Sequence, residues 1–132
     1  MNGKGKTVLL VEDNEDNRIV YSTILRHFGY TVTEALNGEE GISKARAERP
    51  DLILMDMDLP VLSGWQATNC LKSGPETFMI PIIALTAYVL SDDRERCFDV
   101  GCDEYESKPI EFASLLKKIQ TLLNSQSKSA AT

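Results

Sequence analysis

The sequence predicts an α/β fold in which a doubly wound, five-stranded parallel sheet carries helices on both faces, a three-layer sandwich. Apolar runs of strand length alternate five times with segments of helical periodicity, the pattern of βα units joined in parallel. Several of these runs end directly in polar side chains, as strands do at a ligand-binding sheet edge. At 132 residues the chain fits one such domain, with nothing left over for a second.

The first half of the chain contains two strands and two helices. Residues 8–11 form the first strand, and residues 13–16 offer N-cap side chains and acids that suit the start of a helix. Gly29 ends this helix, residues 30–34 form the second strand, and residues 38–49 form a helix that Pro50 ends. The first helix carries a set of side chains at helical spacing: Ile19, Val20, Thr23, Ile24 and His27.

The central segments follow the same alternation. Residues 52–56 form a third strand, in which Asp56 closes an apolar run, and residues 64–72 form a third helix. Pro81 opens the fourth strand, because the first strand position tolerates a missing N–H donor. Ser91 begins a fourth helix, which ends near Gly101.

The C-terminal part begins with a short edge strand over residues 103–107. The last helix has one apolar stripe, formed by Phe112, Leu115, Leu116, Ile119, Leu122 and Leu123. We expect a flexible N-terminus over residues 1–5, the folded domain over residues 6–124, and a disordered Ser/Ala/Gln/Lys-rich tail over residues 125–132.

Composition excludes several classes of protein. The net charge of -6 and the lack of a basic cluster argue against direct nucleic-acid binding. No run approaches membrane-spanning length, and no apolar segment follows the N-terminal lysines, so neither membrane insertion nor a signal peptide is expected. Cys70, Cys97 and Cys102 show no metal-binding spacing and are typical of free thiols, which favours a cytoplasmic protein.

The polar strand ends predict one functional site. Glu12 and Asp13 follow the first strand, Asp56 ends the third, Thr86 ends the fourth, and Lys108 follows the fifth. Ligands of open parallel sheets bind at the carboxyl ends of the strands, where the strand order reverses. We therefore expect three carboxylates, a hydroxyl and an ammonium group around one crevice.

The acids of this crevice suit Mg²⁺, which prefers carboxylate oxygens and retained waters. Three unpaired carboxylates repel one another, and a divalent cation relieves that repulsion. Asp56 is either a metal ligand, a nucleophile toward phosphorus, or both. Lys108 can pair with phosphoryl oxygens, and Pro109, which shapes the turn after it, can form a cis peptide bond.

The polar residues also resemble a known family. Val11-Glu12-Asp13-Asn14, the segment from Asp56-Met57-Asp58-Leu59-Pro60 to Gly64, Thr86-Ala87, and Tyr105 with Ser107-Lys108-Pro109-Ile110 occur in this order. Together they resemble the response-regulator receiver domain, the CheY-like fold, over roughly residues 6–124. The resemblance implies a flavodoxin-like strand order of 2-1-3-4-5, with Pro60, Gly64 and Pro109 in turns beside the site.

The resemblance implies transfer of a phosphoryl group from a phosphohistidine to Asp56. It implies Mg²⁺, for which Mn²⁺ can substitute, bound by Asp13, Asp56, the backbone carbonyl of Asp58 and a water held by Glu12. Thr86, the backbone of Ala87 and Lys108 would bind the phosphoryl oxygens.

The resemblance also implies a switch formed by Thr86 and Tyr105. The hydroxyl group would follow the phosphoryl group inward, the aromatic ring would turn in behind it, and the surface of the fourth helix, fifth strand and fifth helix would change. Asp58 and Tyr88, each two residues after a site residue, are expected to tune the lifetime of the phosphorylated state.

The prediction is therefore a stand-alone receiver that promotes only its own phosphorylation and dephosphorylation. Its expected partners are a sensor histidine kinase or histidine phosphotransfer protein and an unidentified downstream protein. Three alternatives remain open: a haloacid-dehalogenase-type phosphatase suggested by Asp56-Met57-Asp58, a receiver-like adaptor that needs no phosphate, and a flavodoxin-like cofactor binder. The phosphatase normally has its nucleophile after the first strand, and the acidic loop after residue 11 would repel a cofactor phosphate.

Overall fold

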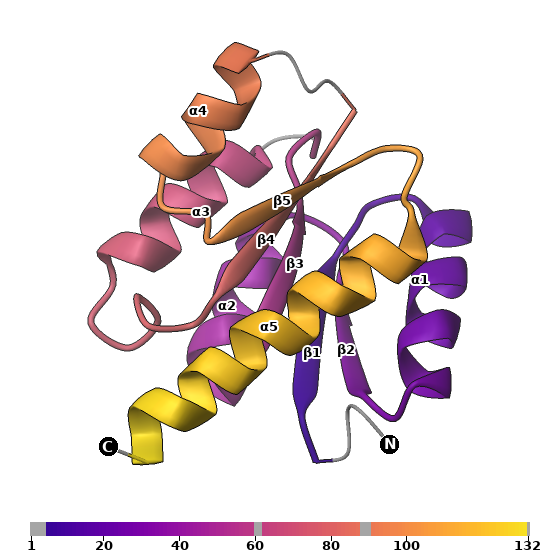
Figure 1. Cartoon of the computed structure of the whole chain (residues 1–132). Helices are drawn as coiled ribbons and strands as arrows, with labels where there is room; N and C mark the ends of the chain where they lie inside the picture. The colour runs from indigo at the N-terminus through magenta and orange to yellow at the C-terminus, as the bar shows by residue number, and fades with distance from the viewer. Residues whose placement is uncertain (1–4, 60–61, 88–90, 132) are drawn as a thin grey trace.

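The structure, a computed structural model, describes residues 5–59, 62–87 and 91–131 and contains one five-stranded sheet (Figure 1). Its strands are all parallel and lie in the order β2-β1-β3-β4-β5, which confirms the predicted fold class and strand order. The strands are β1 Thr7–Val11, β2 Thr31–Ala35, β3 Leu52–Asp56, β4 Ile82–Thr86 and β5 Glu104–Ser107.

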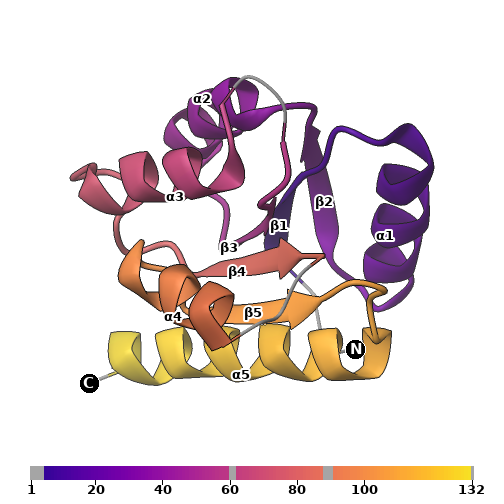
Figure 2. The ribbon, with the colours of Figure 1, turned by 90° about the horizontal axis from the view of Figure 1, so that it is seen from above.

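Five helices cover the two faces of the sheet (Figure 2). They are α1 Glu15–His27, α2 Gly38–Glu48, α3 Gly64–Ser73, α4 Ser91–Asp99 and α5 Phe112–Ala131. α1 and α5 pack on one face, and α2, α3 and α4 pack on the other. This is the doubly wound arrangement, in which the strand order reverses between β1 and β3.

Polar caps set where the helices on either side of the site begin. The Asn14 side chain accepts a hydrogen bond from the Asn17 N–H at 2.9 Å, which confirms an N-cap within residues 13–16. Ser63 and Gln66 form a reciprocal capping box at the start of α3. The caps satisfy N–H groups that the helices cannot, and they fix where each chain segment leaves the strand ends.

Two hydrophobic cores lie above and below the sheet. Successive residues of a strand point to opposite faces, so Leu9 and Val11 pack toward α2 and α3 whereas Val8 and Leu10 pack toward α1 and α5. All five residues of β3 are buried, which explains why this strand is apolar as far as Asp56. Cys97 and Cys102 are buried and form no disulfide.

The face by which α1 packs differs from the one expected. Ile19 and Val20 are 55% and 48% exposed, and the buried residues of α1 are Tyr21, Ser22 and Leu25. The Tyr21 ring packs edge-on against Phe112 of α5 at a centroid distance of 5.7 Å. Burying this large ring turns the preceding apolar pair toward the outside.

The end of the chain also differs from the expectation, because α5 continues past Ser125 to Ala131. The segment has no Gly or Pro, and its Gln, Lys and Ala residues have good helix propensity. The expected flexible N-terminus falls largely on residues 1–4, which lie outside the described residues.

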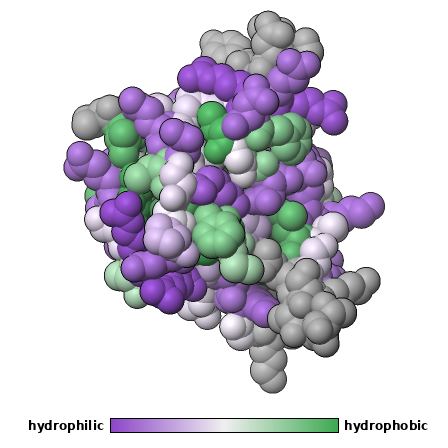
Figure 3. All heavy atoms as spheres, turned by 90° about the vertical axis from the view of Figure 1, so that its left-hand side faces the viewer, coloured by the Kyte–Doolittle hydropathy of each residue, from purple (hydrophilic) through white to green (hydrophobic). Residues whose placement is uncertain are grey.

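The described surface is mixed in polarity. On the left-hand side of Figure 1, apolar residues lie in small separate groups among hydrophilic ones (Figure 3). No helix within the described ranges is both long and apolar enough to cross a bilayer.

Candidate functional site

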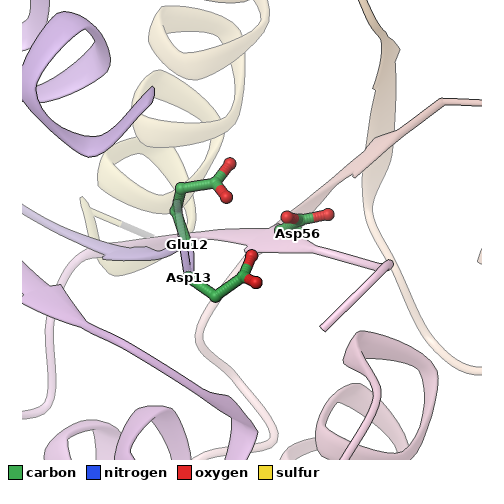
Figure 4. Close-up of side chains that lie close together, drawn as sticks. All are labelled: Glu12, Asp13 and Asp56. Carbon is green, nitrogen blue, oxygen red and sulfur yellow. The ribbon is translucent and has the colours of Figure 1, made fainter. Parts of the chain in front are cut away.

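Three carboxylates meet at the carboxyl ends of β1 and β3 (Figure 4). Glu12 and Asp13 directly follow β1, Asp56 is the last residue of β3, and their ligand atoms lie within 4.8 Å of one another. Glu12 is 1% exposed and Asp56 2% exposed, whereas Asp13 is open to solvent. The predicted clustering is therefore confirmed, and the cluster has a buried floor and an accessible side.

Asp56 is held by two donors on one of its oxygens. Its Oδ1 accepts a hydrogen bond from Lys108 Nζ at 3.0 Å and from the Asp58 N–H at 2.9 Å. The Asp58 side chain itself is exposed. The carboxylate is thus oriented from both sides before any ligand arrives.

The main chain delivers Lys108 to this position. Its N–H donates to the Thr86 carbonyl at 2.8 Å, which extends the pairing of β4 and β5 by one residue. The following Lys108–Pro109 peptide bond is cis, the isomer that the sequence allows. The pKa of Lys108 is raised: burial alone would lower it, but the hydrogen bond and charge of Asp56, with Glu12 behind them, outweigh burial.

Glu12 shows most clearly that the cluster suits a cation. The pKa of Glu12 is raised to about 7, chiefly because burial disfavours the charged form; the charge of Asp56 also raises it, whereas the hydrogen bond from Asn14 and the charge of Lys108 lower it. Its Oε2 accepts a hydrogen bond from the Asn14 N–H at 3.1 Å, while its buried Oε1 has no hydrogen-bond partner among the described residues. A buried, unpartnered carboxylate oxygen beside two further carboxylates fits a hard divalent cation such as Mg²⁺.

Gly64 lets the chain pass close to the site. A Cβ atom at this position would lie 2.2 Å from the Asp56 carbonyl oxygen and 2.6 Å from the Met57 Cα. Both atoms belong to the backbone and cannot move aside, so only glycine fits at the start of α3. Pro60 and Tyr88, two other predicted site residues, lie outside the described residues.

The remaining predicted residues lie toward β5 and its flanking helices. Thr86 ends β4 and is 4% exposed, and Ala87 after it is exposed. The Tyr105 ring is partly buried and packs near Arg94 and Phe98 of α4 and Lys118 of α5, at centroid distances of 5.5, 6.3 and 5.1 Å. The Tyr105 ring therefore lies between α4 and α5.

Arg18, which no motif in the sequence predicts, also lies at the site. Its Nη1 atom donates hydrogen bonds to the backbone carbonyls of Glu12 and Asp13, both at 3.0 Å. The only signal in the sequence is that Arg18 lies one helical turn after Asn14, the N-cap, so that its side chain can reach back over the loop.

Comparison with known proteins gives consistent matches. Residues 8–120 match the family model of the response regulator receiver domain. The polar-differentiation response regulator DivK of Brucella anthropi is 42% identical over 118 residues, which cover 89% of this chain and 96% of that protein.

Two solved structures resemble the chain in both fold and sequence. One is the receiver domain of sensor histidine kinase PA1611 from Pseudomonas aeruginosa PAO1, with a magnesium ion coordinated in its active-site cleft. It has 41% identity and a TM-score of 0.84, and the match covers 91% of this chain and 98% of that one.

The other is the receiver domain of Saccharomyces cerevisiae Ssk1 in complex with the histidine phosphotransfer protein Ypd1. It has 30% identity and a TM-score of 0.85, and the match covers 94% of this chain and 92% of that one. With the acidic cluster at the strand-order reversal and the family model matching most of its length, the chain belongs to the response regulator receiver domains, the regulatory modules of two-component signalling.

Proposed function

We propose that this protein is a phosphoacceptor, and that Asp56 receives the phosphoryl group. The observation that carries the proposal is the Asp56 carboxylate, which is buried, bonded to Lys108 at 3.0 Å, and adjacent to two further carboxylates. A carboxylate in this setting is oriented for attack, while the ammonium group is already in place for the incoming negative charge.

The donor is a phosphohistidine. An oxygen of Asp56 attacks phosphorus, the new O–P bond forms as the N–P bond breaks, and the electron pair of that bond stays on the imidazole nitrogen, which takes up a proton. The product is an aspartyl phosphate. The charge on the transferred group is stabilised by three donors from two strand ends: the Thr86 hydroxyl and the Ala87 N–H at the end of β4, and Lys108 after β5.

Asp13 and Asp56, the backbone carbonyl of Asp58 and a water held by Glu12 would hold Mg²⁺ in this site. Mn²⁺, which takes similar oxygen ligands, can substitute. The ion supplies positive charge for the phosphoryl oxygens during transfer. The Mg²⁺ in the cleft of the PA1611 receiver domain and the partnerless Oε1 of Glu12 support this assignment.

Phosphorylation then changes the surface formed by α4, β5 and α5. Thr86 moves toward the phosphoryl group, and the Tyr105 ring turns inward into the space behind it. In the structure the ring contacts Arg94, Phe98 and Lys118, so its departure would remove an aromatic contact from both flanking helices.

The partners follow from the same chemistry. A sensor histidine kinase or a histidine phosphotransfer protein supplies the phosphoryl group, as the complex of Ssk1 with Ypd1 illustrates for another receiver. A downstream protein reads the α4–β5–α5 surface. A cytoplasmic location stays a prediction, made from the cysteine pattern of the sequence.

The proposal is tested by intact mass spectrometry after incubation with Mg²⁺ and acetyl phosphate. We expect one added phosphoryl group on the wild type, none on Asp56→Asn, and none after chelation. Asp99→Asn is the matched control, because Asp99 is an exposed aspartate on α4 away from the cluster, and it should be phosphorylated like the wild type.

A beryllofluoride complex resolves the case of an adduct too short-lived to detect. If neither an adduct nor a beryllofluoride complex forms while Mg²⁺ still binds, the phosphate-independent adaptor is the better description. Continuous release of phosphate from a phosphomonoester would instead revive the phosphatase alternative, although Asp56 follows the third strand here.

The lifetime of the aspartyl phosphate is the finer part of the proposal. Asp58 is exposed directly beside the Asp56 carboxylate, and Tyr88 follows Thr86 by two residues. We expect Asp58→Asn and Tyr88→Ala to change the hydrolysis rate, measured by the decay of the adduct after removal of the donor. Unchanged decay in both variants would show that neither side chain controls access of water.

A further inference from the structure

Arg18 makes an unusual contact for a residue in the first turns of a helix. Both of its hydrogen bonds from Nη1 go to backbone carbonyls of the acidic loop, those of Glu12 and Asp13, each at 3.0 Å. The side chain is only 15% exposed, so it lies along the protein and not in solvent. One nitrogen with two N–H groups therefore holds two consecutive peptide units of the loop.

The opposite edge of the guanidinium group faces β2. Arg18 Nε lies 3.7 Å from Oε1 of Glu34, and the other carboxylate oxygen of Glu34 pairs with Arg26 at 3.4 Å. Lys44 of α2 donates a hydrogen bond to the Glu34 backbone carbonyl. Glu34 is thus tied to two helices, which gives Arg18 a fixed anchor.

Two hydrogen bonds of Glu12 also anchor the loop that Arg18 holds. The Glu12 N–H donates to the Ala35 carbonyl of β2 at 3.0 Å, and Oε2 of Glu12 accepts from the Asn14 N–H. Arg18 adds two hydrogen bonds, to the backbone carbonyls of the two residues whose carboxylates enter the cluster. Without it, these carbonyls would turn toward water and the acidic pair would sample several orientations.

We propose that Arg18 is a positioning residue for the cation site, acting through the backbone of Glu12 and Asp13. The inference rests on the proposed function, since it concerns the same Mg²⁺. Mg²⁺ demands near-ideal octahedral geometry, so an ordered pair of carboxylates binds it more tightly than a mobile one. Arg18 orders the carboxylates of Glu12 and Asp13 before the ion binds, while its own positive charge stays beside the backbone carbonyls of the loop.

The alternative is that Arg18 acts only as a nearby positive charge, and the two possibilities predict changes of opposite sign. A positive charge repels Mg²⁺, so removing it would strengthen Mg²⁺ binding. Removing a positioning residue would weaken binding, despite the loss of that repulsion. The direction of the change in Mg²⁺ affinity therefore separates the two roles.

The experiment is a calorimetric titration with Mg²⁺ at about pH 8, where Glu12, with a pKa of about 7, is mostly ionised. Arg18→Met keeps the length of the side chain and removes its donors. We expect it to bind Mg²⁺ about 10-fold more weakly than the wild type, within the range for residues that orient metal ligands. Arg18→Lys keeps the positive charge but loses the planar set of guanidinium donors, and we expect its Mg²⁺ affinity to lie between those of the wild type and Arg18→Met.

Arg26→Met is the matched control. Arg26 lies on the same helix, pairs with the same Glu34 and carries the same charge, but it bonds the Val32 carbonyl and not the acidic loop. We expect its Mg²⁺ affinity to stay within about 2-fold of the wild type, because exposed charges are well screened. Urea unfolding of every variant in chelator shows separately what each substitution costs in stability.

If Arg18→Met does not fold, Arg18→Lys and Glu34→Gln decide the question. Arg18→Lys removes the guanidinium group that bonds the loop, and Glu34→Gln removes the carboxylate that holds this group in place. Stronger or unchanged Mg²⁺ binding in the Arg18 variants, or weakening that Arg26→Met reproduces, would overturn the positioning role alone. A wild type that binds no Mg²⁺, or whose binding survives Asp13→Asn, would overturn the proposed cation site and this inference with it.

Discussion

The buried carboxylate of Glu12 should make the stability of the metal-free protein fall as pH rises. Its pKa is about 7 in the folded protein, against an ordinary value of 4.5, because burial and Asp56 disfavour the charged form. Between these two values the folded protein holds a proton that the unfolded chain has lost. The stabilisation is therefore complete below pH 4.5 and disappears as pH rises through 7.

The size of the effect follows from the two pKa values. Each pH unit between 4.5 and about 7 corresponds to about 1.36 kcal/mol. Between about pH 5 and pH 8, this one group should lower the free energy of unfolding by about 2.5 kcal/mol. That is a large fraction of the total stability of a small domain.

The assay is urea unfolding in chelator at several pH values, for the wild type and for Glu12→Gln. Gln retains an oxygen that can accept the Asn14 N–H but has no proton to lose, so the difference between the two proteins isolates Glu12. We expect the wild type to lose stability relative to Glu12→Gln as pH rises. A difference that is flat, or that grows in favour of the wild type, would refute the reasoning.

Mg²⁺ should reverse the trend. The ion binds the ionised carboxylates, so it stabilises the folded protein more at about pH 8 than at about pH 5. Glu12→Gln should lose most of this pH dependence. Equal stabilisation by Mg²⁺ at both pH values would mean that Glu12 does not take part in the site.

Three further substitutions test contacts that hold the fold together. Gly64→Ala should destabilise the protein by about 2–3 kcal/mol in urea unfolding, because the new Cβ would meet the Asp56 carbonyl oxygen at 2.2 Å. Gly41→Ala should cost less, because its Cβ would meet a methyl group of the Val11 side chain, at 2.9 Å. Lys72→Met should cost about 2 kcal/mol, measured in the same way, since the ammonium group pairs with Asp103 at 2.9 Å and bonds two backbone carbonyls. An effect of Lys72→Met no larger than that of a surface substitution would show that these bonds contribute little.

Much of the site could be predicted because its residues stand at strand ends. An apolar run marks a strand whatever its neighbours are, and the polar residue that closes the run must lie at the carboxyl edge of a parallel sheet. Asp56, Glu12 and Lys108 could therefore be placed together from their positions in the chain. The strand order came from the resemblance of the motifs to a family, since the alternation of elements alone does not decide which strands are neighbours.

Other features depend on contacts between elements that are distant in the sequence. Periodicity shows that α1 is a helix, but the packing of Tyr21 against Phe112 decides which of its faces is buried, and Ile19 and Val20 are exposed as a result. Amphipathic helices with more than one apolar stripe leave this choice to tertiary packing. The same is true of α5, whose helical end beyond Ser125 has no apolar stripe to predict it.

Residue order is enough to predict the class of the sheet and the identity of the acids, hydroxyl and lysine at its edge, because both are local properties of the chain. How these groups behave depends on contacts made in the folded protein. The pKa of Glu12 depends on the residues that bury it. The role of Arg18 depends on where the backbone carbonyls of Glu12 and Asp13 lie in the folded protein. Burial and backbone hydrogen bonds are properties of the folded chain. This is why the pKa of Glu12 and the role of Arg18, unlike the residue composition of the site, could not be derived from residue order.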